Sequence, residues 1–140
     1  SAYPWSAGFG TKYADPGTVP TGYGYSAAFG TSEVAVAHAT TPFVSAYPWS
    51  AGFGTKYADP GTVPTGYGYS AAFGTSEVAV AHATTPFVSA YPWSAGFGTK
   101  YADPGTLPIG TGEGVAFFTA AAAGLSIPVG MSQYRRLRAT

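Results

Sequence analysis

The sequence contains no cysteine and very few charged residues. Without cysteine, disulfide bonds, thiolate zinc sites and cysteine nucleophiles are all excluded. Only 9% of the residues are charged, and the formal net charge is zero. This balance argues against binding to nucleic acid or to an anionic membrane, because phosphate binding requires an excess of lysine and arginine on one face. We expect neither partner, and the composition does not indicate a cellular compartment.

Long hydrophobic runs are also missing. The longest apolar run covers residues 115–125 and is too short to cross a bilayer. The first residues do not combine a basic region with an apolar segment, so they do not predict a targeting signal. With 140 residues, of which 46% are hydrophobic, the chain is expected to form one globular domain.

A repeat of 44 residues organises the sequence. Units 1–44 and 45–88 are identical, and a third unit, 89–132, keeps this identity through Thr106 and then diverges. Residues 133–140 form a basic tail that holds all three arginines, and we expect it to be solvated. Identity of this kind indicates recent duplication or deliberate engineering. We interpret residues 1–140 as a single repeat domain.

Glycine and proline decide the type of secondary structure. The 20 glycines and 12 prolines are spread so evenly that no window can hold an uninterrupted amphipathic helix. Between them lie short segments rich in valine, tyrosine, phenylalanine and threonine, which favour strands. The pattern predicts four strands per unit, at 23–30, 33–39, 43–49 and 53–57, with a turn at 58–62. In the third unit it predicts strands at 115–119 and 124–129.

The faces of these predicted strands suggest how the units are arranged. Alternation places aromatic side chains on one face of each four-stranded meander and small side chains on the other. Neither face suits water, so the sheets must stack on one another. Radial stacking of four-stranded sheets gives a β-propeller, in which one blade takes about 40 to 45 residues. The sequence therefore predicts an all-β propeller of four-stranded antiparallel blades.

The units resemble the WD-repeat β-propellers, in particular their divergent bacterial and phage-type blades. The similarity lies in an apolar strand ending at Phe29 before a short turn, a small-residue strand over 34–38, and a third strand that ends at Trp49. Residues 114–117 of the third unit resemble the first strand of the family still more closely. The resemblance implies a propeller closed by pairing of C-terminal with N-terminal strands. The family's Gly-His pair is absent and Trp49 is followed by serine, so we carry over no residue role.

The number of blades predicts an oligomer. The chain holds about three blades' worth of strands, whereas propellers have about four to eight blades. A homo-oligomer would complete the ring, and a homodimer with six blades is the favoured form because it has closed symmetry.

No residue pattern in the chain predicts catalysis or metal binding. His38 and His82 are the only imidazoles, and neither has a second ligand at metal-binding spacing, so we expect both to be hydrogen-bonded structural residues. A Gly-x-Ser-x-Gly motif is absent. We predict no catalytic residue, no metal site and no cofactor, and we expect the chain not to be an enzyme. Asp15, Asp59 and Asp103 each precede Pro-Gly and are predicted to cap turns.

A Tyr-x-Trp pair recurs in each unit and is the candidate ligand-binding feature. The pairs are Tyr3 with Trp5, Tyr47 with Trp49, and Tyr91 with Trp93. Packing between blades is one interpretation. The other is a set of equivalent aromatic pockets that bind a carbohydrate or a peptide through several weak contacts.

Three functions are compatible with these observations. The first is a non-catalytic propeller that serves as a scaffold or as a binding and assembly module. The second is a lectin-like propeller that uses the aromatic pockets. The third is an extracellular structural material, since repeats rich in glycine, tyrosine and alanine also build fibres.

Overall fold

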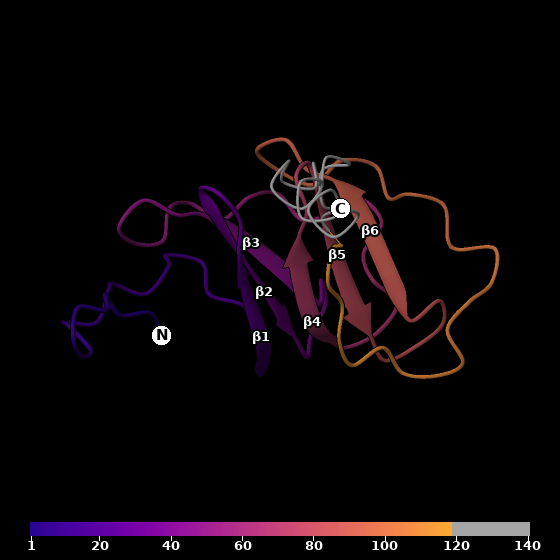
Figure 1. Cartoon of the computed structure of the whole chain (residues 1–140), viewed down its shortest axis with the longest axis horizontal. Coiled ribbons are helices and arrows are strands. Elements are labelled where there is room, and N and C mark those ends of the chain that lie inside the picture. Colours follow the sequence, from indigo (N-terminus) through magenta and orange to yellow (C-terminus); the bar gives the residue numbers. More distant parts are fainter. Residues whose placement is uncertain (119–140) are drawn as a thin grey trace, which may run out of the picture.

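The computed structural model describes residues 1–118, and within them the chain consists of strands and loops without a helix. Six strands form two antiparallel sheets of three strands each (Figure 1). The all-β prediction is therefore confirmed.

Each sheet is a meander in which every strand pairs with its neighbour in sequence. The first sheet contains β1 (Gly24–Phe29), β2 (Glu33–His38) and β3 (Val44–Pro48). The second contains β4 (Gly68–Phe73), β5 (Glu77–His82) and β6 (Val88–Pro92). All six strands lie within the ranges that the glycine and proline pattern predicts. The two sheets also share one register, displaced by one repeat.

The turns follow from side-chain chemistry close in sequence. Between β1 and β2, the Gly30 N–H donates to the Glu33 carbonyl at 2.9 Å, and the Glu33 carboxylate accepts from the backbone N–H groups of Thr31 and Ser32. Between β2 and β3, the Phe43 N–H donates to the Thr40 carbonyl at 2.8 Å. These bonds satisfy the backbone groups that the ladders leave free and close each hairpin tightly.

The predicted fourth strand is wrong for the described sheets. Residues 53–57 do not form a strand, and a single bridge pairs Trp49 with Phe53. The outer edge of β3 offers carbonyl groups to this segment: Gly54 N donates to Pro48 O at 2.8 Å, and Tyr57 N donates to Ala46 O at 2.9 Å. Pro48 has no N–H that could donate a hydrogen bond back to this segment, so a regular ladder does not extend past β3. Each sheet therefore has three strands with an irregular fourth segment beside it.

The two faces of each sheet differ in side-chain size. We call one the valine face, because it carries the valines of the middle strand, and the other the alanine face. The valine face of the first sheet consists of Ala27, Phe29, Val34, Val36, Ser45 and Tyr47. Its alanine face consists of Ala28, Ala35, Ala37, Val44 and Ala46. The second sheet has the same faces one repeat later.

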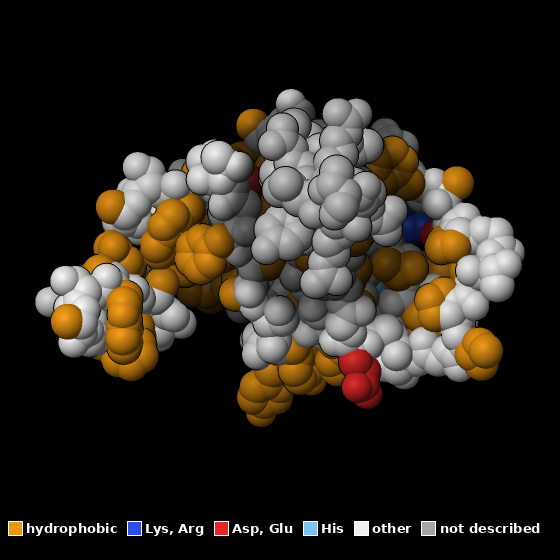
Figure 2. All heavy atoms as spheres, viewed as in Figure 1, with side chains coloured by type: hydrophobic (Ala, Val, Ile, Leu, Met, Phe, Trp, Pro, Cys, Tyr) orange, Lys and Arg blue, Asp and Glu red, His pale blue; other side chains and the backbone are white. Residues whose placement is uncertain are grey.

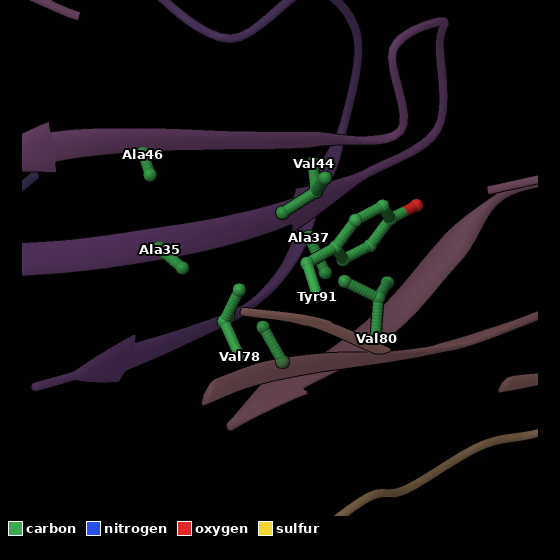
Figure 3. Close-up of a cluster of buried hydrophobic side chains, with 8 residues drawn as sticks. Ala35, Ala37, Val44, Ala46, Val78, Val80 and Tyr91 are labelled. Atoms are coloured by element: carbon green, nitrogen blue, oxygen red, sulfur yellow. The ribbon is translucent and has the colours of Figure 1, made fainter. Parts of the chain in front are cut away.

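The core forms where the two sheets meet, and it joins unlike faces. Ala35, Ala37, Val44 and Ala46 from the alanine face of the first sheet share one buried cluster with Ala71, Val78, Val80 and Tyr91 from the valine face of the second. Figure 3 shows the labelled side chains of the two sheets directed toward one another. Because the face used by one sheet differs from the face used by the next, this junction has a direction and can repeat.

The two sheets lie closest at their first strands. β4 lies against β1 and also approaches β2, whereas β3 and β6 are not in close backbone contact. Glycine permits the close approach: a methyl group on Gly68 would overlap the carbonyl oxygen of Phe43. Larger side chains, among them Tyr57, Trp93 and Phe97, pack at the edge of the core cluster. Small side chains thus make up most of the centre of the junction, and large aromatic side chains lie at its margin.

The third unit begins on the second sheet in the way that β4 begins on the first. Gly112 lies against the carbonyl oxygen of Phe87, as Gly68 lies against that of Phe43, and its N–H donates to His82 O at 3.1 Å. The strand predicted at 115–119 is not formed over its described residues, 115–118. The strand predicted at 124–129 and the basic tail at 133–140 lie outside the described residues.

Candidate functional site

The valine face of the first sheet is open around Ala27, Phe29 and Val36, although its sequence is identical to that of the buried valine face of the second. Val80 is fully buried and Ala71 is 6% exposed, because the first sheet covers them. Their equivalents are Val36, which is half-buried, and Ala27, which is exposed. Phe29 is 60% exposed. This difference in exposure arises from the position of each sheet in the stack. The valine face of the first sheet is therefore the candidate interaction surface.

A groove of about 440 Å³ runs over this face. Its floor includes Ala27, Val34 and Val36, and Trp49 and Phe53 close one side. A second cavity of about 260 Å³ adjoins it and shares Gly24, Val36 and Phe53. The surface is largely apolar, and side chains of the same kinds fill the core of the internal junction.

The N-terminal segment lies along one edge of the groove, where a third strand of a preceding sheet would lie. Ser1, Ala2 and Tyr3 line the groove, and they correspond in sequence to Ser45, Ala46 and Tyr47. Tyr13 N donates to Ala2 O at 3.0 Å, as Tyr57 N donates to Ala46 O at 2.9 Å.

The aromatic contacts repeat in the same way. The Tyr13 ring packs edge-on against Trp49 with centroids 5.2 Å apart, and Tyr57 packs against Trp93 at the same separation. The N-terminal segment thus repeats, beside the groove, the contacts that residues 46 and 57 make beside the second sheet.

In the two complete sheets, the Tyr-x-Trp pairs belong to the packing. Tyr47 and Tyr91 are fully buried, and their hydroxyl groups donate to the carbonyls of Thr18 and Thr62 at 2.8 Å. Burial raises the pKa of Tyr91 to about 12. Trp49 contacts the rings of Tyr13, Phe29 and Phe53, and Trp93 contacts the equivalent three. These four residues thus contact other parts of the chain through their rings or hydroxyl groups.

The first pair lies in a different environment. Tyr3 is 44% exposed and Trp5 is 70% exposed. Both rings contact Phe9, with centroids 5.6 and 5.1 Å apart. Trp5 has no described counterpart of the Tyr13 and Phe29 rings that flank Trp49. Figure 2 shows the resulting hydrophobic side chains on the surface of the N-terminal segment and beside the first sheet.

The two histidines are buried in their sheets. His38 Nε2 lies 3.0 Å from Ser45 Oγ, and His82 Nε2 lies 3.0 Å from Ser89 Oγ. This agrees with the predicted hydrogen-bonded structural role. Burial lowers the pKa of both imidazoles. The serine partners were not predicted, although Ser45 and His38 fall on the same face in a period-two pattern. A fully buried His–Ser pair does not meet a substrate from solution.

The aspartates predicted to cap turns take part in short-range ion pairs. Lys12 Nζ lies 2.6 Å from the Asp15 carboxylate, and Lys56 and Lys100 pair with Asp59 and Asp103 in the same manner. The hydrogen bond from Lys12 lowers the pKa of Asp15. In residues 1–118, no group of three histidine, aspartate or glutamate side chains lies close enough to hold a metal ion.

The comparisons with known proteins return no relative: no family model, no curated protein and no solved structure matches the chain. In the described part of the chain, no helix has the length and apolar character needed to cross a membrane. The open valine face, the exposed aromatic pair beside it and the directional junction between the sheets are therefore the features on which a function must rest.

Proposed function

We propose that this chain is a non-catalytic scaffold built from stacked sheets, which act as the blades of a WD-repeat-like β-propeller. We further propose that a second copy of the chain completes the ring, giving six blades from two chains. The observation that carries the proposal is the junction between the sheets, which joins an alanine face to a valine face.

The shape of the junction favours a ring. The sheets approach most closely at their first strands, where Gly68 meets the backbone of Phe43. Large aromatic side chains pack at the junction's margin. Repetition of such a wedge turns the stack about an axis, as radial packing requires. The start of a third unit on the second sheet supports a count of about three blades per chain.

Burial of the polar groups supports a role without catalysis. The imidazoles and the serine hydroxyls that they contact are enclosed between strands, and the Lys–Asp pairs hold turns at the surface. A general base must reach the proton that it removes, and neither histidine has access to solvent.

The decisive experiment is the mass of the full chain in solution. We expect sedimentation equilibrium to give twice the chain mass of 14.2 kDa at micromolar concentration. A folded monomer at every concentration would contradict completion of the ring by a second copy. A broad distribution of very large species would instead favour the structural material, because a directional junction that does not close continues as a filament.

Carbohydrate binding is the second candidate, and the exposed Tyr3 and Trp5 favour it. Aromatic rings open to solvent are suitable surfaces for sugar rings. Titration of common monosaccharides into the full chain, followed by tryptophan fluorescence, tests this candidate. A Trp5→Phe variant that abolishes a fluorescence change would locate the site, and an unchanged spectrum would argue against it.

A further inference from the structure

The internal junction shows what covers a valine face. In the second sheet, Ala71 and Val80 are buried under the alanine face of the first, and Ala28 packs at the edge of the same cluster. The first sheet offers the same side chains, Ala27 and Val36, to an open groove. Its natural occupant is therefore a sheet of this repeat, with its alanine face turned toward the groove.

One strand of that occupant is already in place. The N-terminal residues Ser1 to Tyr3 line the groove in the position of a third strand. What is lacking is a first strand ending in phenylalanine, since Phe29 packs against Trp49 and Phe73 against Trp93 with centroids 5.1 Å apart. Among the described residues, Trp5 has no phenylalanine of a first strand packed against it, and this accounts for its exposure.

The third unit supplies a segment with the sequence of such a strand. Residues 112–118 correspond in sequence to residues 24–30 and 68–74, which include all of β1 and β4, with Ala116 at the position of Ala28 and Phe117 at the position of Phe29. Ala116 is exposed, and the Phe117 ring lies over Gly74 of the second sheet. Ala116, the equivalent of Ala28 on the alanine face of the first sheet, is thus accessible to a second copy.

We propose that residues 112–118 of a second copy dock in the groove on the valine face of the first sheet. There Ala116 of one copy faces Ala27 of the other, because inside the chain the equivalent Ala28 packs against the buried cluster that contains Ala71, the equivalent of Ala27. Phe117 of the second copy provides the missing aromatic partner of Trp5. This inference rests on the proposed scaffold function, and it specifies which surfaces the two copies use.

Residues 112–118 lie far from the groove of their own chain. Residue 112 contacts the second sheet, and the groove lies on the far face of the first. Two packed sheets separate these positions, each about 10 Å from the next. Figure 1 shows the N-terminal segment beside the first sheet and the orange third unit beside the second. Residues 112–118 of the same chain therefore do not occupy the groove, and we assign it to these residues of a second copy.

Disulfide trapping tests the proposal, because the natural chain has no cysteine to interfere. The double variant Ala27→Cys with Ala116→Cys is expected to form covalent dimers under mild oxidation at micromolar concentration. Each single variant is expected to form at least tenfold less dimer, since a Cα–Cα distance above about 7 Å prevents a bond. Circular dichroism checks that all three variants fold.

The outcomes separate this inference from the proposed function. Strong dimer formation by Ala27→Cys alone would mean that two valine faces meet, and it would overturn the inference. Association of the chains without trapping in the double variant would also overturn it, while leaving the scaffold function intact. Chains that remain monomeric would contradict both. Phe117→Ala provides an independent check, because it should weaken association at least tenfold and restore the fluorescence of an exposed Trp5.

Discussion

His38 and His82 are fully buried in their sheets. Each Nε2 contacts a serine hydroxyl, and each Nδ1 has no hydrogen-bond partner. Burial lowers the pKa of both imidazoles, so the folded chain holds them in the neutral form. Identical repeats therefore place two equivalent titrating groups in the core of a very small protein.

This placement predicts a loss of stability in mild acid. The pKa is lower in the folded chain than in the unfolded chain, so the stabilisation is fully present above the unfolded pKa of about 6.5. It is lost as the pH falls below that value toward the folded pKa, because the unfolded chain binds the protons first. We expect the urea midpoint to fall between about pH 7 and pH 5.

The double variant His38→Gln with His82→Gln provides the control for this prediction. It should be less stable at neutral pH, yet its urea midpoint should change little over the same pH range. If its midpoint falls as steeply as that of the natural chain, the histidines are not responsible.

At the scale of the element, the close approach of β4 to the first sheet depends on glycine. Gly24 and Gly68 occupy the same position in identical units, but a methyl group on Gly24 would meet only Val36 Cγ1, at 3.6 Å. On Gly68 it would overlap the Phe43 carbonyl oxygen. The first strands of the two sheets thus differ in environment alone.

The matched variants Gly68→Ala and Gly24→Ala measure this difference. We expect Gly68→Ala to lower the free energy of unfolding by about 1–3 kcal/mol, as overpacking does. Gly24→Ala should change it by less than about 1 kcal/mol. Chemical denaturation at a concentration where the chain is monomeric compares the two. Equal effects would mean that the sheets do not pack as described.

The elements also show how far the sequence determines the structure. The three strands of each sheet were predictable because glycine and proline bound short alternating runs. The fourth segment was not, because the effect of Pro48 depends on which side of β3 its missing N–H would face. For the candidate site, the sequence pattern identified the residues of the aromatic pairs. Their different exposure was not predictable, since identical sequences cannot reveal which copy lies at the end of a stack.

At the scale of the whole molecule, Val36 and Val80 test whether the stack folds as one unit. Lysine at position 80 would place an unpaired charge in the fully buried junction, which costs on the order of 3–5 kcal/mol. Lysine at the half-buried position 36 can extend its amine to solvent and should cost less than about 1 kcal/mol.

Thermal unfolding of dilute Val80→Lys and Val36→Lys compares these costs. We expect Val80→Lys to lower Tm strongly in a single transition that includes both sheets, because the junction is their shared core. Two separate transitions would show that each sheet is stable alone. We do not expect this of a three-stranded meander of this size.

The identical register of the two sheets has a consequence for inheritance. Residues 1–106 repeat with a period of 44, so the loss of any 44 consecutive residues within them leaves the same amino-acid sequence, wherever the break falls. The shortened protein would keep every remaining hairpin and junction whole. Gain of one unit would likewise add one complete sheet. Changes in length by whole periods among descendants of such a gene would then add or remove one complete three-stranded sheet at a time.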